Sequence, residues 1–591
     1  MGPDDSPFGP RLLPGGGVRF ALVAPAWDAA WLEGVDPAGT VHRRLAMARD
    51  GAGVFWVDDP EAGPHTLYRF AGPNGAIPDP ASRHQPFGVD GPSRVPAACR
   101  PPDWPGRPWA EAVIAEIHVG TATPEGTFAG LEKRLDHYAG LGLTALQLMP
   151  VAAWAGGRNW GYDGVLPFAT VQPYGRPEDL ARLVAAAHAR GLMVFLDVVY
   201  NHLGPAGNPF PDPWPGLFHP RLATPWGPAP DFSRPLARRL VIDNALHWLE
   251  TMNLDGLRLD AVDRIIADGP TPLLAELAAR VAELPGRPRH LILENDANQA
   301  HWLARDARGA PRFHTAQWGD DGHHAAHVLA TGERGAYYGD FQDDPATHLA
   351  RALAEGFAYQ GEASPHRGGA PRGTPSRHLP PAALVGYLQS HDQVGNRAFG
   401  DRLDSLAPAP AVAALEALFR LAPQIPMLFM GEEWGARTPF LFFTDFEPAL
   451  GEAVRQGRLG ELVRLPGFPA DPRRTPPPDP QDPETFAASR LDWAEAETPD
   501  GAARLARTRA LLAARRRHVV PLIDRLTRAG SWRRFGAAGL SVLWRAEEGA
   551  HISVTANLSS HPAAPPDPWP GPPFWRDGRP GDPWSVEWRA A

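Results

Sequence analysis

The sequence predicts an α/β protein built on a closed (β/α)8 TIM barrel, with a further β-rich region on each side of it. Two observations support this prediction. From residue 112 onward, short apolar runs of strand length alternate with longer segments of helical periodicity. There are eight such runs, and eight strands each followed by a helix imply a parallel sheet that closes into a barrel.

Each predicted barrel strand is a short run of mainly apolar residues. In chain order the runs are AVIAEIHV (112–119), TALQLMP (144–150), LMVFLDVV (192–199), GLRLD (256–260), HLILE (290–294), RFHTAQW (312–318), LVGYLQS (384–390) and IPMLFMG (425–431). The first run continues as HVGTATPEGTF, without the glycine-rich phosphate turn that an open doubly wound sheet would place there. The closed barrel is therefore favoured over the open sheet.

Amphipathic segments between these runs are the predicted helices. They include 128–142, 177–191, 234–252 and 271–284. The second of them begins at a proline, which suits the first turn of a helix, and ends at a glycine, which suits its C-terminal cap. The barrel and its loop insertions are expected to span 103–525.

The two flanks do not follow the barrel pattern. Residues 1–102 contain strand-like runs split by turns, which predicts a small β-sandwich. Residues 526–591 follow a long helical segment and predict another β domain, whose tail, rich in proline and tryptophan, is expected to be largely irregular. The segment 203–220 after the third barrel strand predicts a long loop, and long loops at this end of a barrel often have a function.

Composition narrows the class of protein. The chain has 591 residues and a formal net charge of −10, and Lys133 is its one lysine among many arginines, so we expect no nucleic-acid partner. The single cysteine, Cys99, excludes an internal disulfide. No apolar run approaches membrane-spanning length, and the first residues lack a signal-peptide core. These features predict a cytoplasmic protein with no membrane partner.

Polar residues gather where the predicted barrel strands end, which is where barrel enzymes keep their chemistry. The third strand ends with Asp197, Asn201 and His202, the fourth with Arg258 and Asp260, the fifth with Glu294, and the seventh with His391 and Asp392. One such ion pair can be structural, and surface pairs stabilise little. Several carboxylates with His and Arg at one mouth are typical of an active site.

Cleavage of a glycosidic bond is a reaction that needs paired carboxyl groups. One acts as an acid and the other as a nucleophile or base, on either side of an oxocarbenium-like transition state. Trp160 and Tyr162 lie in a glycine-rich loop after the second strand, where flat aromatic faces are expected to pack against sugar rings. The sequence thus favours a carbohydrate-active enzyme.

Four segments resemble the signature regions of the alpha-amylase superfamily of glycoside hydrolases, in the order and on the strands of that family: DVVYNH (197–202), GLRLDAVD (256–263), LILEND (291–296) and QSHDQVGN (389–396). Further segments, among them RNWGYDGV and TAQWGDDGHHAAHVLATGERGAYYGDF, resemble the maltooligosyltrehalose trehalohydrolase family within it. The leading sandwich is then similar to those of carbohydrate-binding modules. Asn295 departs from that family's pattern, which has an acidic residue there.

The resemblance implies a role for each residue. Asp260 would be the nucleophile of a retaining mechanism, Glu294 the general acid and then the base, and Asp392 a stabiliser of the transition state. Arg258 would keep Asp260 ionised and oriented. The substrate-binding set implied by the resemblance is Trp160, Tyr162, Asp197, His202, Arg258, Asp263, Asp320, Asp321, His323, His391, Gln393 and Asn396.

The residue pattern and the family resemblance also predict which metals, cofactors and partners the protein has. The run Asp320, Asp321, His323 and His324 lacks the further ligand that a zinc site needs at a defined spacing, so we expect no metal and no cofactor. The implied substrate is maltooligosyltrehalose, cut to release trehalose, and a metabolic link to maltooligosyltrehalose synthase follows. The alternatives are a glycogen branching or debranching enzyme of the same superfamily and a catalytically inactive glucan-binding protein. The intact Asp260, Glu294 and Asp392 argue against the inactive protein.

Overall fold

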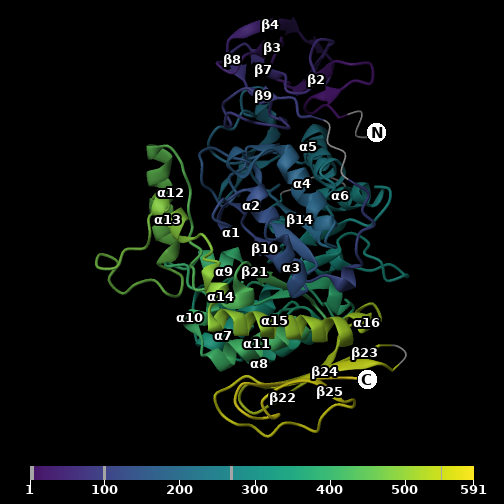
Figure 1. Ribbon diagram of the computed structural model, residues 1–591, viewed down its shortest axis with the longest axis vertical. Coiled ribbons are helices and arrows are strands. Elements are labelled where there is room, and N and C mark those ends of the chain that lie inside the picture. Colours follow the sequence, from purple (N-terminus) through teal and green to yellow (C-terminus); the bar gives the residue numbers. More distant parts are fainter. Residues whose placement is uncertain (1–5, 98–101, 266–270, 547–548) are drawn as a thin grey trace.

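A computed structural model describes residues 6–97, 102–265, 271–546 and 549–591 of the chain. Cys99 lies outside the described residues. Figure 1 shows an elongated molecule in which the N-terminal β region is at the top, the barrel is in the middle and the C-terminal sheet is at the bottom. Helices α12 (Pro448–Leu462) and α13 (Pro483–Ala488) project from the left-hand side of the barrel.

The predicted closed barrel is confirmed, with its eight parallel strands in chain order. They are β10 (Ile114–Ile117), β11 (Ala145–Leu148), β14 (Met193–Val198), β17 (Gly256–Leu259), β18 (His290–Leu293), β19 (Ala316–Trp318), β20 (Leu384–Tyr387) and β21 (Ile425–Phe429). Each lies inside a run that the apolar pattern predicts. Nearly every residue of these strands is buried, as expected when side chains fill a barrel on one face and meet helices on the other.

Helices surround the barrel, and most begin at a proline or at a side-chain cap. Those of the first half are α1 (Val119–Ala122), α2 (Phe128–Glu132), α3 (Leu135–Leu141), α4 (Pro177–His188), α5 (Pro235–Leu246) and α6 (Leu273–Ala282). Those of the second half are α7 (Asp320–Thr331), α8 (Pro345–Glu355), α9 (His391–Gly395), α10 (Leu403–Leu406), α11 (Ala409–Leu421), α12 (Pro448–Leu462), α13 (Pro483–Ala488), α14 (Ala494–Glu497), α15 (Pro499–His518) and α16 (Val520–Ile523). After α5 the chain continues as a π-helical turn, His247–Thr251.

The N-terminal β region is made of two small sheets. One has the order β1-β2-β6-β5 and the other β4-β3-β7-β8, with β9 paired to β7. Their bounds are β1 (Arg11–Leu12), β2 (Val18–Val23), β3 (Trp31–Val35), β4 (Val41–Ala46), β5 (Ala48–Arg49), β6 (Val54–Asp59), β7 (Leu67–Gly72), β8 (Gly75–Ile77) and β9 (Ser93–Arg94). Phe20 of β2 and Tyr68 of β7 pack against each other between the sheets, with ring centroids 4.6 Å apart. The apolar side chains on the inner faces of the two sheets form the core of this region.

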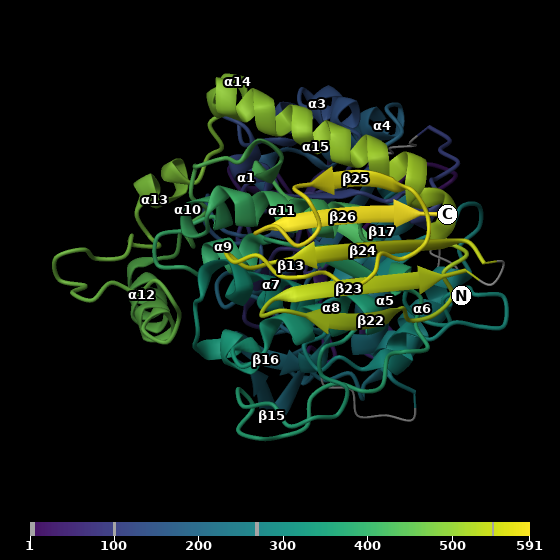
Figure 2. The same ribbon diagram turned by 90° about the horizontal axis from the view of Figure 1, so that it is seen from below.

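The C-terminal region is one antiparallel sheet that lies across α8 and α11 (Figure 2). Its order is β22 (Ser531–Phe535), β23 (Gly539–Arg545), β24 (His551–Asn557), β26 (Ser585–Ala590) and β25 (Pro573–Asp577). The expectation of an irregular tail is therefore wrong for its last part. Trp588 is fully buried, stacks on Trp544 at 6.0 Å and donates through Nε1 to the carbonyl of Ala417, and these contacts hold the tail in the sheet.

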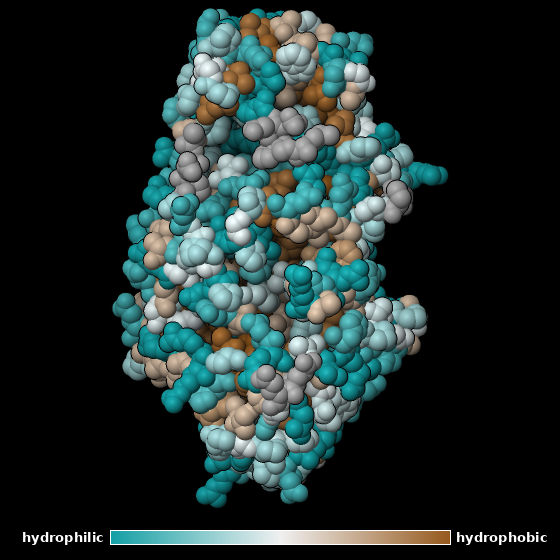
Figure 3. All heavy atoms as spheres, turned by 90° about the vertical axis from the view of Figure 1, so that its right-hand side faces the viewer, coloured by the Kyte–Doolittle hydropathy of each residue, from teal (hydrophilic) through white to brown (hydrophobic). Residues whose placement is uncertain are grey.

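Two short hairpins extend from the strand-end face of the barrel: β12 (Ala152–Ala153) with β13 (Leu166–Thr170), and β15 (Phe218–Thr224) with β16 (Gly227–Pro230). The second begins at Phe218, near the end of the predicted long loop 203–220, and continues beyond it. On the face of the molecule in Figure 3, hydrophilic and hydrophobic residues are interspersed. Among the described residues, none of the helices combines the length and the apolar character that crossing a membrane requires.

Candidate active site

Arg258 lies at the centre of the candidate site, fully buried on β17. The strand register places it opposite Asp197 of β14, and its Nη1 donates to Asp197 Oδ2 at 2.7 Å and to Asp260 Oδ1 at 2.8 Å. Its Nη2 lies 2.8 Å from Glu294 Oε2, and its guanidinium carbon is 4.3 Å from the ring centroid of Trp318. One guanidinium therefore joins carboxyl groups from three neighbouring strands.

The backbone turns sharply directly after Asp260. Ala261 has a φ of +40°, in the left-handed region that a side chain with a Cβ rarely adopts. This conformation directs the Ala261 N–H to Glu294 Oε2 at 2.8 Å, while Val262 N donates to the Glu294 carbonyl at 3.0 Å. Asn201 donates to Asp260 Oδ2 at 2.9 Å. The strained turn thus fixes the two catalytic candidates relative to each other.

Glu294 is held in a state that favours its protonated form. Burial raises the pKa of its carboxyl group, and the negative charge of Asp260 raises it further. Arg258 and the Ala261 N–H act in the opposite direction. The direction of the shift is the one that a general acid working near neutral pH requires.

Asp392, the third predicted carboxylate, lies at the start of α9 and is more open to solvent, with its side chain 37% exposed. Asn396, one turn further along the chain, donates to Asp392 Oδ1 at 3.2 Å. Arg458 of α12 donates in turn to Asn396 Oδ1 at 2.9 Å and to the carbonyl of Gly395. The projecting α12 helix therefore supports the loop that presents Asp392.

His391 is buried between acidic groups. Its Nδ1 lies 2.6 Å from Oε1 of Glu116, whose Oε2 also accepts from the His391 backbone N–H at 2.9 Å. Its Nε2 is 2.8 Å from the hydroxyl of Tyr162, which donates its own proton to Asp197 at 2.9 Å, so both ring nitrogens donate. Although burial by itself disfavours the charged ring, Asp392 and Glu116 raise the pKa of His391 to about 9.

Replacing Glu116 by Gln is expected to lower the pKa of His391 towards its ordinary value near 6.5. Because the pKa of His391 is raised to about 9, its ring is charged at neutral pH and loses its proton as the pH rises through 9. In Glu116→Gln the alkaline limb of kcat/KM should therefore move to lower pH. Glu111→Gln is the control, because Glu111 precedes the N-terminal end of β10, whereas Glu116 lies towards its C-terminal end. If the alkaline limb of kcat/KM does not move in Glu116→Gln, Glu116 does not raise the pKa of His391.

Three residues of the expected substrate-binding set are buried and have protein contacts. Trp160 is buried, and its Nε1 donates to the carbonyl of Leu441. Asp321 is buried and paired with Arg372 at 2.8 Å. His323 is buried, and its Nδ1 lies 2.5 Å from the carbonyl oxygen of Leu388. A contact of these three side chains with a sugar stays a prediction.

Three further polar residues of the predicted set, His202, His391 and Gln393, already have protein partners. The ring nitrogens of His202 lie 2.5 Å from Asn201 Oδ1 and 2.9 Å from the Tyr162 carbonyl, so a hydrogen bond to sugar requires one of these contacts to be exchanged. The same holds for His391. Gln393 accepts from Ser390 at the first turn of α9, where it forms a capping box.

Asp263 and Asp320 bring further carboxyl groups to the same mouth. Burial, then the charge of Glu294, raises the pKa of Asp320 to about 8, although the hydroxyl of Tyr387 donates to it. Burial also raises the pKa of Asp263, which pairs with Arg264. Among the described residues, no three His, Cys, Asp or Glu side chains are grouped so as to hold a metal ion.

Sequence reasoning missed Glu116 and Trp226. Glu116 could have been found from the sequence, because a charged residue in the middle of the apolar run of β10 must point into the barrel. No pattern in the sequence points to Trp226. It lies at the turn between β15 and β16, is 49% exposed, and stacks over His202 with ring centroids 5.4 Å apart, so the hairpin brings an open indole face to the mouth.

Replacing Trp226 by Ala is expected to raise KM by about 2- to 10-fold and to change kcat much less. An aromatic stacking contact contributes about 0.5–1.5 kcal/mol beyond its buried area, and we expect the indole to contact a sugar ring before and during the reaction alike. Trp56→Ala is the matched control, since Trp56 is a similarly exposed indole on β6. An unchanged KM in Trp226→Ala would exclude the platform.

The comparisons agree with this geometry. Residues 98–213 match the family model "Alpha amylase, catalytic domain". The malto-oligosyltrehalose trehalohydrolase of Arthrobacter ramosus is 45% identical over 518 residues, covering 83% of this chain and 86% of that protein. A 1,4-alpha-glucan branching enzyme of Bordetella pertussis is 34% identical, but over 42% of this chain and 37% of its own length.

Similarity extends to solved structures. The crystal structure of an alpha-amylase-like protein from Salmonella typhimurium superposes with a TM-score of 0.94 at 42% identity, covering 99% of this chain and 100% of that one. The barrel, the carboxyl groups at its strand ends and the long match to the Arthrobacter protein agree with one another. The chain therefore belongs to the malto-oligosyltrehalose trehalohydrolase family of alpha-amylase-type glycosidases.

Proposed function

We propose that this chain hydrolyses the α-1,4-glucosidic bond between trehalose and the maltooligosaccharide of maltooligosyltrehalose, with retention of anomeric configuration. The observation that best supports this is the shared guanidinium of Arg258, which contacts Asp260 through Nη1 and Glu294 through Nη2, each at 2.8 Å. Two carboxyl groups held by one guanidinium supply the nucleophile and the general acid that a retaining mechanism requires.

In the first step an oxygen of Asp260 attacks the anomeric carbon of the sugar while Glu294 gives its proton to the glycosidic oxygen. The bond between that carbon and that oxygen breaks, trehalose leaves, and the glucan stays as an ester on Asp260. Asn201 and Arg258 hold the attacking carboxylate in place, since each donates to one of its oxygens. The upward shift in the pKa of Glu294, caused by its burial, favours the protonated carboxyl group that this step requires.

In the second step Glu294, now ionised, takes a proton from a water molecule that attacks the same anomeric carbon. The ester bond breaks, Asp260 regains its carboxylate, and a shortened maltooligosaccharide leaves. We propose that Asp392 binds sugar hydroxyls more strongly as the ring distorts, because it is the most exposed of the three carboxylates. Tyr162, whose hydroxyl is held by Asp197 and His391, would contact the same sugar.

The leaving-group side is assigned to Asp320 and Asp263, whose pKa values are both raised by burial and in part by the charge of Glu294. Because the pKa of Asp320 is about 8, its carboxyl group donates a hydrogen bond near neutral pH and suits a sugar hydroxyl. This activity would supply trehalose in its biosynthesis from α-glucan. Its substrate would come from maltooligosyltrehalose synthase.

Product analysis by chromatography tests the proposal. The protein is incubated with maltotriosyltrehalose and, separately, with maltopentaose and amylose. Trehalose released from the first with little attack on the others is the expected result. New α-1,6 branches in amylose would transfer the chain to the branching enzymes, and no turnover of any substrate would favour a glucan-binding protein.

A further inference from the structure

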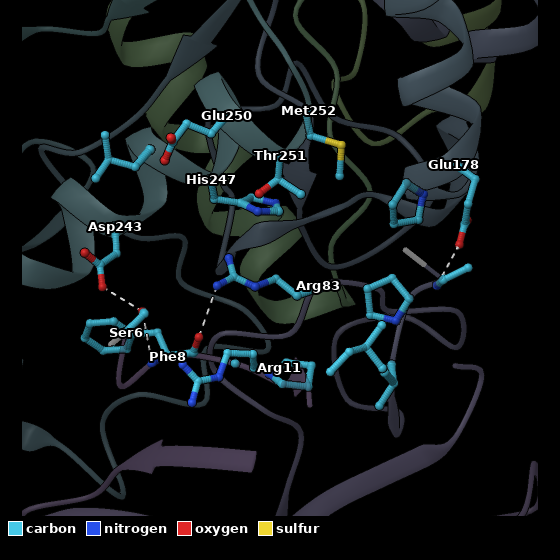
Figure 4. Close-up of a pocket in the computed structure, with 18 of the residues that line it drawn as sticks. Ser6, Phe8, Arg11, Arg83, Glu178, Asp243, His247, Glu250, Thr251 and Met252 are labelled. Atoms are coloured by element: carbon cyan, nitrogen blue, oxygen red, sulfur yellow. Dashed lines mark hydrogen bonds between the residues drawn. The ribbon is translucent and has the colours of Figure 1, made fainter. Parts of the chain in front are cut away.

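A cavity lies on the outside of the barrel, between the start of the described chain and helices α4, α5 and α6 (Figure 4). Its volume is about 360 Å³. Residues 6–12 and 95–97 form one side, and the end of α5 with its π-helical turn forms another. None of its lining residues belongs to the catalytic set at the strand ends.

The π-helical turn places polar side chains on this cavity. Met252 N donates to the carbonyl of His247, five residues earlier, at 3.2 Å, and this widened turn breaks the regular α-helical ladder. As a result His247, Glu250 and Thr251 all line the cavity. Single π-turns within helices occur frequently at functional sites, because they redirect side chains at a cost in backbone geometry.

Three buried polar atoms of the lining residues have no hydrogen-bond partner among the described residues. They are Nη1 of Arg83, Nε2 of His247 and Oε2 of Glu178. His247 itself is only 8% exposed. Buried polar atoms are nearly always paired, and each unpaired one destabilises the fold, so three of them around one cavity indicate a missing partner.

The protonation states of His247 and Arg83 decide which hydrogen-bond donors and acceptors the missing partner needs. Burial and then the charge of Arg83 hold the pKa of His247 well below its usual range, so the ring is neutral. The Phe168 backbone carbonyl accepts from one ring nitrogen, which leaves the unpaired Nε2 as an acceptor. Arg83 keeps its charge at neutral pH and donates to the Phe8 carbonyl at 3.0 Å, with Nη1 free to donate.

The cavity therefore offers one donor and two acceptors. An anion would pair with Arg83 but would leave the two acceptors, Nε2 of His247 and Oε2 of Glu178, unpaired. A cation would be repelled by the guanidinium of Arg83. The charged lining residues balance: Arg11, Arg83 and Arg280 against Glu178, Asp243 and Glu250. A hydroxyl group both donates and accepts, so several hydroxyls on one neutral molecule match this set.

We propose that this cavity binds a small neutral polyhydroxylated molecule, a mono- or disaccharide, at a site separate from the strand-end mouth. Apolar walls from Phe8, Leu12, Val95 and Met252 suit the C–H faces of a sugar ring. The volume lies at the lower end of the range of about 300–1,000 Å³ for ligand pockets, which excludes a long glucan. The site goes beyond the proposed function.

Hydrogen exchange with trehalose or maltose as the probe tests the site in the full-length protein. At saturating sugar we expect slower exchange in peptides that cover 243–252 and 6–12, in addition to any effect at the strand ends. Thr251 is exposed at the rim, so Thr251→Trp should fill the entrance and leave the fold intact. It should abolish protection of 243–252 and leave that of the strand ends unchanged, whereas Thr251→Ser should retain both.

Three results would overturn the proposal: no protection of 243–252 at sugar concentrations that saturate the mouth, protection that persists in Thr251→Trp, or protection by inorganic phosphate without protection by sugar. The measurement reads binding and not turnover. A failure of this site is therefore distinguishable from a failure of the proposed hydrolysis, which product analysis reports.

Discussion

Glu294→Gln is expected to lower kcat on maltooligosyltrehalose by about 10²–10⁴-fold, the range that general acid–base catalysis contributes. The amide keeps the shape of the side chain and its contact with the Ala261 N–H, but it cannot give a proton to the glycosidic oxygen. Steady-state rates of trehalose release measure the loss. KM should change little, because Glu294 acts on the bond in the transition state.

A substrate with a good leaving group separates chemistry from misfolding. Such a leaving group departs without protonation, so the first step of Glu294→Gln on an activated glycoside should be far less impaired than on the natural substrate. Glu283→Gln, at an exposed glutamate after α6, is the matched control and should keep full activity. Equal losses on both substrates would remove Glu294 from the role of general acid.

Arg258→Met is expected to destabilise the protein by about 3–5 kcal/mol, the effect of leaving buried carboxylates without their partner. Arg258 is fully buried and contacts Asp197, Asp260 and Glu294 together. Without it the pKa of Asp197, already about 7, and the pKa of Glu294 should rise further. Thermal denaturation and trehalose release measure the two effects.

A double variant shows which effect belongs to the fold and which to catalysis. Asp197→Leu combined with Arg258→Met removes both partners of the buried pair, so part of the lost stability should return while activity stays low. Recovery of activity together with stability would mean that Arg258 serves the fold alone. Full stability and activity in Arg258→Met itself would contradict its central position.

The apolar alternation predicted the barrel because the strand period and the helix period differ, and each of the eight runs contained its strand. Asp260, Glu294 and Asp392 could be placed at one mouth from the sequence because each follows a predicted barrel strand, and parallel strands bring their carboxyl ends to one edge. The pairing of Arg258 with Asp260 was also readable, because residues two apart on a strand share a face.

Other site residues could not be read in this way. Trp160 and Tyr162 stand two apart in one loop, yet the first is buried against Phe440 and the second reaches Asp197. A loop has no fixed period, so its sequence does not say which side chain turns inward. The tail was expected to be irregular because prolines interrupt its pattern, whereas β26 pairs with β24 over its whole length.

The sequence by itself determined the barrel, the order of its strands and the carboxyl groups at their ends, since these depend on periodicity and local spacing. The tertiary structure alone decided the contacts between distant segments. It brought Glu116 to His391 from 275 residues away, the Trp226 hairpin to His202, and three unpaired polar atoms to one cavity. Such contacts depend on how separate elements pack, and no local pattern along the chain encodes which partner a buried polar group will meet.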